Sequence, residues 1–399
     1  MQRVIGSRGL LRAPCFQRGA VRSYSTPNNT YIDVSKLTVQ KTTHPKPKTP
    51  HQKLVFGKEF TDHMLTVDWS VENGWEAPKI TPYGNLSISP ASCSLHYAIQ
   101  LFEGMKAYKD KEGRVRLFRP DKNFERMNNS ARRLALPTLN PEGVTECIKA
   151  LLRVDQDWIP SEKGYSLYLR PTLIGNQESL GVSPPNAAKM FVICSPVGPY
   201  YPDGFKPVKL LADHINVRAW PGGTGSYKLG ANYAGGILPQ QNAMKRGYSQ
   251  ILWLFSDQHY LTEVGTMNLF LFWKNEEGKL ELVTPPLDGS ILPGVTRDSI
   301  LTIVKEWNEF QVTERPVKMA EVIKAIEEKR LMEIFGAGTA AIVSPVKQIH
   351  FNDKDYDIPI NVEDPSATIG PLARRVVDRI MAIQYGEVDH PWSVIIDDQ

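Results

Sequence analysis

The chain has 399 residues, of which 41% are hydrophobic and 23% charged, the balance of a globular protein long enough for two domains. No apolar run reaches the roughly 18 residues that a membrane-spanning helix needs, so we expect no membrane segment. The four cysteines form no CxxC pair and the eight histidines no HxH or HExxH motif, so we expect neither a disulfide framework nor a metal site.

The N-terminus is rich in arginine. Residues 1–32 contain five arginines and no acidic residue, a composition typical of a mitochondrial transit peptide. We expect residues 1–24 to be removed in the mitochondrial matrix, because RSYS (22–25) resembles a matrix-protease site cut after Tyr24. A basic tail that binds nucleic acid is the alternative. Removal would leave 42 basic against 43 acidic residues, so we expect no nucleic-acid partner.

The next residues predict an arm and then two α/β domains. Residues 25–53 are rich in Thr, Pro, Lys and Asn, which indicates a flexible arm. Four prolines and two glycines within 195–207 indicate an interdomain linker. We therefore predict a mixed α/β fold with the active site between its domains. Its parts are a smaller domain over 54–200, a linker over 201–215 and a larger domain over 216–399.

Apolar patterns predict the main elements in this order. The first helix has Asn140 as a polar cap and Pro141 at its first position. Short apolar runs predict buried strands at 190–195, 208–212, 251–255 and 269–273. Apolar stripes predict further helices around 300–307, over 318–334 and over 369–384.

A lysine lies among glycines in WPGGTGSYKLGANY (220–233). Glycines let the backbone approach a ligand closely. The phosphate-loop motif fails because Leu229 follows Lys228, and GxGxxG fails because Lys228 occupies the place of its third glycine. A Schiff-base lysine needs a pKa lowered by burial or by nearby cations, and the apolar Trp220 and Tyr227 permit burial. A solvent-exposed loop lysine is the alternative.

Three further segments carry polar groups at strand or helix ends. Glu263 is flanked by apolar residues and needs a partner if it is buried, although it could lie at a solvent-exposed hairpin edge. LPGVTR (292–297) precedes a helix whose free N–H groups could bind an anion, or Thr296 is only a cap. GAGTAA (336–341) is either a tight turn or one whose amides receive a phosphate or carboxylate.

Two segments nearer the N-terminus combine aromatic and charged residues. The period of two in YSLYLRP (165–171) places Tyr168 and Arg170 on one strand face, where Arg170 could clamp a carboxylate, or be a surface arginine. The aromatic residues of SLHYAIQLFEGM (94–105) are either core or pocket wall.

Seven segments in this order resemble the branched-chain-amino-acid aminotransferases, which are class IV, or fold type IV, pyridoxal-phosphate enzymes. They are SLHYAIQLFEGMKAY, FRPDKNFERMNNSA, LYLRPTLIGNQESLGV, GGTGSYKLGANYAGG, LTEVGTMNLF, LPGVTRDS and GAGTAAIVSPV. The resemblance runs from about residue 55 to beyond residue 346 and implies a two-domain fold type IV enzyme whose larger domain binds pyridoxal 5'-phosphate.

The resemblance also implies residue roles. Lys228 would hold the cofactor as a Schiff base and move the proton between the substrate α-carbon and the cofactor. Glu263 would pair with the pyridine nitrogen and Tyr233 with the ring hydroxyl oxygen. The implied phosphate ligands are Arg126, Val295, Thr296 and Thr339. The implied substrate pocket comprises Phe56, Tyr97, Phe102, Tyr168, Val182, Tyr200, Thr266, Ala340 and Ala341, with Arg170 for the second carboxylate of glutamate.

The implied reaction is reversible amino transfer between L-leucine, L-isoleucine or L-valine and 2-oxoglutarate, in a homodimer. All three amino acids are expected as substrates, because one methylene contributes only about 1–3 kcal/mol to discrimination. A D-amino-acid aminotransferase, an aminodeoxychorismate lyase and a non-catalytic binding module are the alternatives. One departure is visible: some family members have a CxxC pair after the GxGTA turn, where this chain has Ala341 and Ser344, so that redox switch is not expected.

Overall fold

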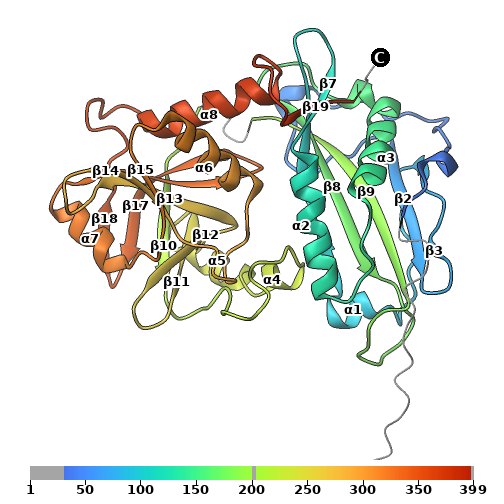
Figure 1. Cartoon of the computed structure of the whole chain (residues 1–399), viewed down its shortest axis with the longest axis horizontal. Helices are drawn as coiled ribbons and strands as arrows, with labels where there is room; N and C mark the ends of the chain where they lie inside the picture. Colours follow the sequence, from blue (N-terminus) through green and yellow to red (C-terminus); the bar gives the residue numbers. More distant parts are fainter. Residues whose placement is uncertain (1–30, 200–203, 397–399) are drawn as a thin grey trace, which may run out of the picture.

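The computed structural model describes residues 31–199 and 204–396, which form two lobes, each built around one sheet (Figure 1). The first lobe is drawn from blue to green and the second from yellow to red. The arrangement confirms the predicted mixed α/β fold class. Of the described helices, none is long and apolar enough to cross a membrane.

The first lobe contains a 10-stranded sheet in the order β1-β4-β2-β9-β8-β6-β7-β19, with β3 on β2 and β5 on β8. Its longest pair is the antiparallel hairpin β8–β9, which includes the strand predicted at 190–195. The strands are β1 (Thr38–Val39), β2 (His63–Ser70), β3 (Gly74–Trp75), β4 (Lys79–Pro82), β5 (Gln100–Phe102), β6 (Met105–Lys109), β7 (Val115–Phe118), β8 (Ser166–Gly175), β9 (Ala187–Val197) and β19 (Ser393–Ile395).

Helices cover one face of this sheet (Figure 1). The predicted helix after Asn140 is confirmed as α3 (Pro141–Val154), and it packs on β2 and on α2 (Pro120–Arg133). Asn140 does not cap its own helix through its side chain, because Oδ1 accepts the N–H of Ile32. The shorter helices of this lobe are η1 (Val34–Lys36), η2 (His51–Lys53), α1 (Cys93–Tyr97) and η3 (Gln156–Trp158).

The arm predicted as flexible lies against the first lobe over its described part, residues 31–53. Ile32 is only 2% exposed and belongs to the apolar core. The backbone N–H of Thr42 donates to Nε2 of His63, whose Nδ1 pairs with buried Asp155 at 2.7 Å. Few apolar residues are needed for this attachment, which explains why composition alone favours a loose arm. The arm leads to Phe56 at the site described below.

The second lobe contains a 9-stranded sheet in the order β12-β11-β10-β17-β16-β13-β14-β15, with β18 on β17. Strand β12 also pairs with β13, so the strands from β12 to β13 close into a ring. The predicted strands at 208–212, 251–255 and 269–273 are confirmed as β10, β11 and β13. The strands are β10 (Val208–Asp213), β11 (Gln250–Phe255), β12 (Tyr260–Val264), β13 (Met267–Lys274), β14 (Leu280–Thr284), β15 (Gln311–Glu314), β16 (Leu331–Gly338), β17 (Ile342–Phe351) and β18 (Lys354–Asp357).

The helices of the second lobe are α4 (Ala231–Ala234), α5 (Ile237–Lys245), α6 (Val295–Trp307), α7 (Met319–Glu327) and α8 (Pro371–Gln384). The predictions around 300–307 and 369–384 are confirmed as α6 and α8. The prediction of one helix over 318–334 is wrong in its second half. Lys329 has a left-handed φ of 54°, and the residues from Leu331 form β16, whose pairing with β13 and β17 overrides the helical pattern.

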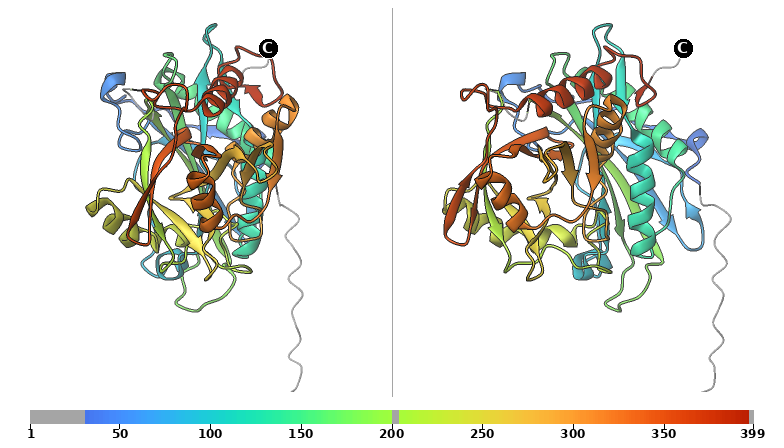
Figure 2. Two further views of the ribbon diagram at one scale, coloured as in Figure 1. Left: turned by 90° about the vertical axis from the view of Figure 1, so that its left-hand side faces the viewer. Right: turned by 60° about the vertical axis from the view of Figure 1, so that its left-hand side comes forward.

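The two lobes share packing as well as chain connections. Helix α8 crosses from the second lobe toward the first, and β19 after it joins the first sheet (Figures 1 and 2). Tyr108 and Phe118 of the first lobe belong to the same apolar cluster as Phe270 and Val376 of the second. Arg119 adds an ion pair of 2.6 Å to Asp298 at the start of α6. The range 201–215 predicted as linker contains β10 of the second sheet.

Candidate active site

A cavity of about 410 Å³ lies between the lobes and is lined from both. The first lobe contributes aromatic residues and an arginine, and the second contributes Lys228 with the hairpin turn between β16 and β17. The lining residues are Phe56, Phe102, Gly104, Tyr168, Arg170, Lys228, Tyr233, Gln250, Thr266, Met267, Gly338, Thr339, Ala340 and Ala341. Sequence reasoning placed ten of these together, so most of the predicted substrate and cofactor residues converge on one cavity.

Lys228 has the environment of a nucleophilic amine. Its Nζ lies 3.1 Å from the hydroxyl oxygen of Tyr233 and 4.8 Å from the ring centroid of Phe102. Burial, and secondarily the positive charge of Arg126, lower the pKa of Lys228 to about 8. A lower pKa leaves more neutral amine near neutral pH, and the neutral amine is the form that attacks a carbonyl. Burial likewise raises the pKa of Tyr233 to about 12.

Glu263 is a buried acid on β12, with 2% of its surface exposed. One carboxylate oxygen accepts the N–H of Leu292 at 2.8 Å, and the other pairs with Nε of Arg218 at 2.9 Å. Burial raises the pKa of Glu263, and the charges of Arg218, Lys228 and Arg126 act in the opposite direction. The exposed hairpin-edge alternative is therefore excluded, and Arg218 is a partner that sequence reasoning missed.

Arg126 on α2 is held by a second buried acid. Its Nε and Nη2 donate to the two carboxylate oxygens of Glu103 at 2.8 and 2.7 Å, and its Nη1 donates to Pro293 O at 2.9 Å. Asn123 also donates to Glu103. Because a guanidinium has five N–H donors, these three bonds fix its plane and leave two donors. Sequence reasoning missed Glu103, although an acid between Phe102 and Gly104 carries the same signal of apolar flanks as Glu263.

The N-terminal turn of α6 lies beside this arginine. Val295 and Thr296 are its first residues, and Gly294 before them adopts an extended conformation. Arg126 and Val295 line one small cavity, while Val295, Thr296 and Thr339 line another that also reaches Gly104. A helix N-terminus presents unpaired N–H groups and a partial positive charge, so together with Arg126 this corner is suited to an anion such as a phosphate.

The turn between β16 and β17 offers a second set of donors. The N–H groups of Thr339, Ala340 and Ala341 donate to no atom in the part of the chain that the structure describes. Ile342 directly after them has a φ of 61°, a left-handed conformation that costs a β-branched residue of the order of 1–3 kcal/mol. Free amides and local strain at one turn beside Lys228 indicate a site for a small carboxylate.

The opposite wall is aromatic and carries one cation. The Arg170 guanidinium lies 4.6 Å from the ring centroid of Phe102 and donates to the Tyr168 hydroxyl at 3.1 Å. Its Nε is buried without a partner in the described chain. Phe56 packs edge-on against Tyr168 at 4.9 Å. A Cβ at Gly104 would lie 2.0 Å from the Tyr168 hydroxyl, so any larger residue there would displace Tyr168 from this wall.

Of the predicted pocket residues that the structure describes, two do not line this cavity. Val182 is 79% exposed, and Tyr97 is 41% exposed with its hydroxyl bonded to Leu180 O. Leu180 is also largely exposed, and the three exposed residues Tyr97, Leu180 and Val182 are termed here the outer loop cluster. The predicted position of Tyr200 lies outside the described residues.

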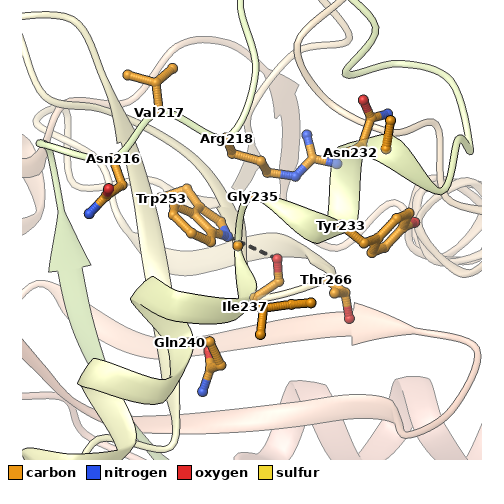
Figure 3. Close-up of a pocket in the computed structure, with 13 residues that line it drawn as sticks. Asn216, Val217, Arg218, Asn232, Tyr233, Gly235, Ile237, Gln240, Trp253 and Thr266 are labelled. Carbon is orange, nitrogen blue, oxygen red and sulfur yellow. Dashed lines mark hydrogen bonds between the residues drawn. The ribbon is translucent and has the colours of Figure 1, made fainter. Parts of the chain in front are cut away.

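A second cavity of about 490 Å³ adjoins the first (Figure 3). Tyr233 and Thr266 line both cavities. The side chains of Arg218, Trp253 and Ile237 surround the second one, and Trp253 Nε1 donates to Gly265 O at 2.9 Å (Figure 3). Among the described residues, no group of three or more His, Cys, Asp or Glu is placed to hold a metal.

Comparison with known proteins agrees with this geometry. Residues 100–349, more than half of the chain, match the amino-transferase class IV family. The branched-chain-amino-acid aminotransferase of Dictyostelium discoideum is 59% identical over 379 residues, covering 94% of this chain and 99% of that protein. The mitochondrial enzyme of that name from Bos taurus is 51% identical, with 96% of both chains covered.

Two further comparisons bear on compartment and fold. A Saccharomyces cerevisiae relative named as cytosolic is 50% identical, covering 92% of this chain and 98% of its own. A crystal structure of the T.th. branched-chain amino acid aminotransferase with pyridoxamine 5'-phosphate superimposes with a TM-score of 0.64 at 26% identity, over 83% of this chain and 98% of that one. The chain therefore belongs to the class IV aminotransferases, and within them to the branched-chain-amino-acid aminotransferases.

The residues present fit pyridoxal 5'-phosphate, the cofactor that the family implies. Its aldehyde needs an amine with a lowered pKa, its phosphate needs several donors, and its ring nitrogen needs a fixed acid. Lys228 meets the first need, and Arg126 with the start of α6 meets the second. Glu263 meets the third, because it is a buried carboxylate whose two oxygens are held by the N–H of Leu292 and by Arg218.

Proposed function

We propose that this protein transfers amino groups reversibly between L-leucine, L-isoleucine or L-valine and 2-oxoglutarate, with pyridoxal 5'-phosphate carried on Lys228. The observation that carries the proposal is the juxtaposition, in one cavity, of the low-pKa amine of Lys228, the free amides of the 339–341 turn and an apolar aromatic wall. An amine, a carboxylate receiver and an apolar side-chain pocket are the three features that an apolar α-amino acid requires.

The bound cofactor would supply an aldehyde that accepts the amino group and a ring that acts as an electron sink. The protein groups orient and tune it. Arg126 with Val295 and Thr296 would hold its phosphate, Tyr233 its ring hydroxyl oxygen and Glu263 its ring nitrogen. Lys228 Nζ would then move a proton at the substrate α-carbon, from a position fixed by its bond to the Tyr233 hydroxyl. The substrate α-carboxylate would be received by Thr266 and the amides of Ala340 and Ala341.

A side-by-side assay tests the reaction. Leucine, isoleucine and valine should all form glutamate from 2-oxoglutarate, while D-alanine and aminodeoxychorismate should not react. D-alanine turnover comparable to leucine turnover would assign the site to a D-amino-acid aminotransferase. No turnover, with no visible absorbance band from added cofactor, would leave a non-catalytic binding module.

Arg170 would let one apolar pocket accept glutamate as well as leucine. Burying an unpaired carboxylate is costly, so the second carboxylate of glutamate needs a donor. The Arg170 guanidinium is stacked on Phe102 and tied to the Tyr168 hydroxyl, so it stands behind the aromatic wall and leaves the wall itself apolar. It has donors to spare, among them the unpartnered Nε.

We predict that Arg170→Met weakens the half-reaction with glutamate or 2-oxoglutarate by ten-fold or more, the effect of losing a charged hydrogen bond. The leucine half-reaction should fall much less. Single-turnover spectra of each half-reaction measure both values in one preparation, so leucine is the internal control. Equal losses with both substrates would show that Arg170 has a structural role or binds the shared α-carboxylate.

A homodimer would give the outer loop cluster a function. Leu180 and Val182 are large apolar residues held at the surface, and exposure of such a cluster favours a protein contact. We propose that Tyr97 and Val182 form pocket wall in the second copy of the chain, in agreement with their predicted role. Light scattering should then give twice the mass of one chain, and a monomer at assay concentration would refute this arrangement.

Residues 1–24 are proposed to direct import into the mitochondrial matrix. The arginine-rich, acid-free composition supports this, as do the names of several relatives, although the cytosolic yeast relative shows that the family occupies both compartments. The segment lies outside the described residues. Sequencing the N-terminus of protein purified from mitochondria should give a start at Ser25, and an intact Met1 form confined to the cytosol would contradict the assignment.

A further inference from the structure

A second buried lysine makes a direct contact between the two lobes. Lys106 on β6 is 8% exposed, and its Nζ donates to the carbonyl oxygen of Ala340 at 2.9 Å. Ala340 belongs to the turn between β16 and β17, which is 234 residues away in the sequence. A side chain of the first lobe thus holds the backbone of the turn whose free amides face the active-site cavity.

The geometry of a peptide unit gives this contact a consequence on the other side of the turn. The peptide joining Ala340 and Ala341 is planar and trans, so its N–H points opposite to its C=O. Ala340 and Ala341 line both the active-site cavity and a neighbouring cavity of about 250 Å³. Lys106 lines the neighbouring cavity and the small cavity beside Thr296, but not the active-site cavity. With the carbonyl drawn toward Lys106, the Ala341 N–H is directed to the side where Lys228 lies.

The turn needs such support because its backbone is strained and sparsely bonded. Ile342 has the left-handed φ given above, and strained conformations persist only where the surroundings hold them. The only hydrogen bond that the carbonyl of Ala340 makes within the described chain is the one from Lys106. A cation at the carbonyl end also polarises the peptide, which makes its N–H a better donor to an anion.

Lys106 is also unusual because it is a charged residue in a buried position. Burial lowers the pKa of Lys106 to about 8, and no acidic side chain in the described chain counteracts that shift. A buried cation without a counter-ion is costly. A substrate carboxylate bound on the other side of the turn would reduce the cost of burying the Lys106 charge. Its negative charge would act on Lys106 across the peptide that joins Ala340 and Ala341.

We infer that Lys106 is a positioning residue that fixes the 339–341 turn for the α-carboxylate, and so sets the affinity for every substrate alike. The inference rests on the proposed function, because it assumes that this turn receives the carboxylate. It differs from the role of Arg170 in a measurable way. Arg170 acts on the side-chain carboxylate that only glutamate and 2-oxoglutarate have, whereas Lys106 acts on the carboxylate that all the substrates share.

The test uses 4-methylvaleric acid, which has the carboxylate and apolar chain of leucine but no amine and therefore cannot react. Calorimetry on the cofactor-loaded enzyme should show that Lys106→Met weakens its binding about ten-fold, the effect of a lost charge-assisted contact. Lys106→Arg, which keeps the charge and the donor, should bind within about three-fold of wild type. Lys109→Met is the matched control, since Lys109 lies on the same strand and bonds a carbonyl of its own lobe, Gln156 O, at 3.3 Å.

Turnover gives an independent readout that loss of folding would not produce. Lys106→Met should raise KM for leucine and for glutamate by the same factor, with kcat changed less than about three-fold and the bound cofactor retained. If Lys106→Met does not accumulate as folded enzyme, Lys106→Gln replaces it, with an expected loss of about three-fold because the amide keeps the hydrogen bond without the charge.

Three outcomes would overturn the inference: unchanged binding in Lys106→Met, an equal loss in Lys109→Met, or a rise in KM for glutamate alone. Wild-type enzyme that does not bind 4-methylvaleric acid would overturn it as well. The proposed function is judged separately, by whether wild-type enzyme transaminates leucine. An enzyme that turns over leucine while Lys106→Met binds normally would retain the function and exclude the role of Lys106.

Discussion

Lys228→Ala is expected to abolish transamination and to remove the visible absorbance band of the bound cofactor. Lys228 supplies the only amine among the described residues that line the active-site cavity, and its lowered pKa and contact with Tyr233 prepare it for attack on a carbonyl. Loss of both the attachment point and the group that moves the proton should cost at least about four orders of magnitude in kcat. Spectra and steady-state rates on the purified variant measure both effects.

Lys109→Ala is the control for this first prediction, because it removes a lysine of the first lobe that lies outside the cavity. It should keep both the absorbance band and the rate. A Lys228→Ala enzyme that retained its rate within ten-fold of wild type would refute the central assignment. If Lys228→Ala lost its rate but kept the absorbance band, the cofactor would have to be bound to another amine. Lys228 would then have the proton-transfer role alone.

Glu103→Gln is expected to destabilise the cofactor-free protein by about 3–5 kcal/mol, the range for breaking one side of a buried ion pair. Glu103 is fully buried and bonds two guanidinium nitrogens of Arg126, which would keep its charge without a counter-ion. In the loaded enzyme the loss should be smaller, because the cofactor phosphate would take the place of the missing anion. Urea unfolding of both forms gives the two values.

The matched control for the second prediction lies on the same helix. Glu125 pairs with Lys122 at 2.9 Å on the exposed face of α2, where an ion pair contributes at most about 1 kcal/mol. Glu125→Gln should therefore change the stability of neither form by more than that. If Glu103→Gln destabilised the loaded enzyme as much as the cofactor-free one, the phosphate would not lie beside Arg126.

Local sequence patterns predicted the helices and strands whose apolar residues recur with a regular period. The apolar run at 251–255 and the stripe over 369–384 needed only a period of two or of 3.6 to be placed, and both are confirmed. The error at 318–334 arose because Leu331–Phe335 satisfies a helical stripe and a buried strand equally well, and only its neighbours β13 and β17 decide between them. Such long-range pairing is not visible in a window of sequence.

The same limit applies to the site. Glu103 and Arg218 were missed because their importance lies in partners, Arg126 and Glu263, that are 23 and 45 positions away. The contact between Lys106 and Ala340 spans more than half of the chain. Motif resemblance assigned roles to Tyr97 and Val182 but carries no information on which copy of the chain they serve, and their exposure raises that question only in the folded protein.

Borohydride reduction of the loaded enzyme, followed by peptide mapping, tests the central claim most directly. Reduction fixes the cofactor to the amine that carries it, so the mass of the labelled peptide identifies the lysine. Among the described residues, two buried lysines, Lys228 and Lys106, have a pKa lowered to about 8, and of these Lys228 alone lines the active-site cavity. The label should be found on the peptide that contains Lys228. A label on Lys106, or no label in an enzyme that still transaminates leucine, would contradict the account.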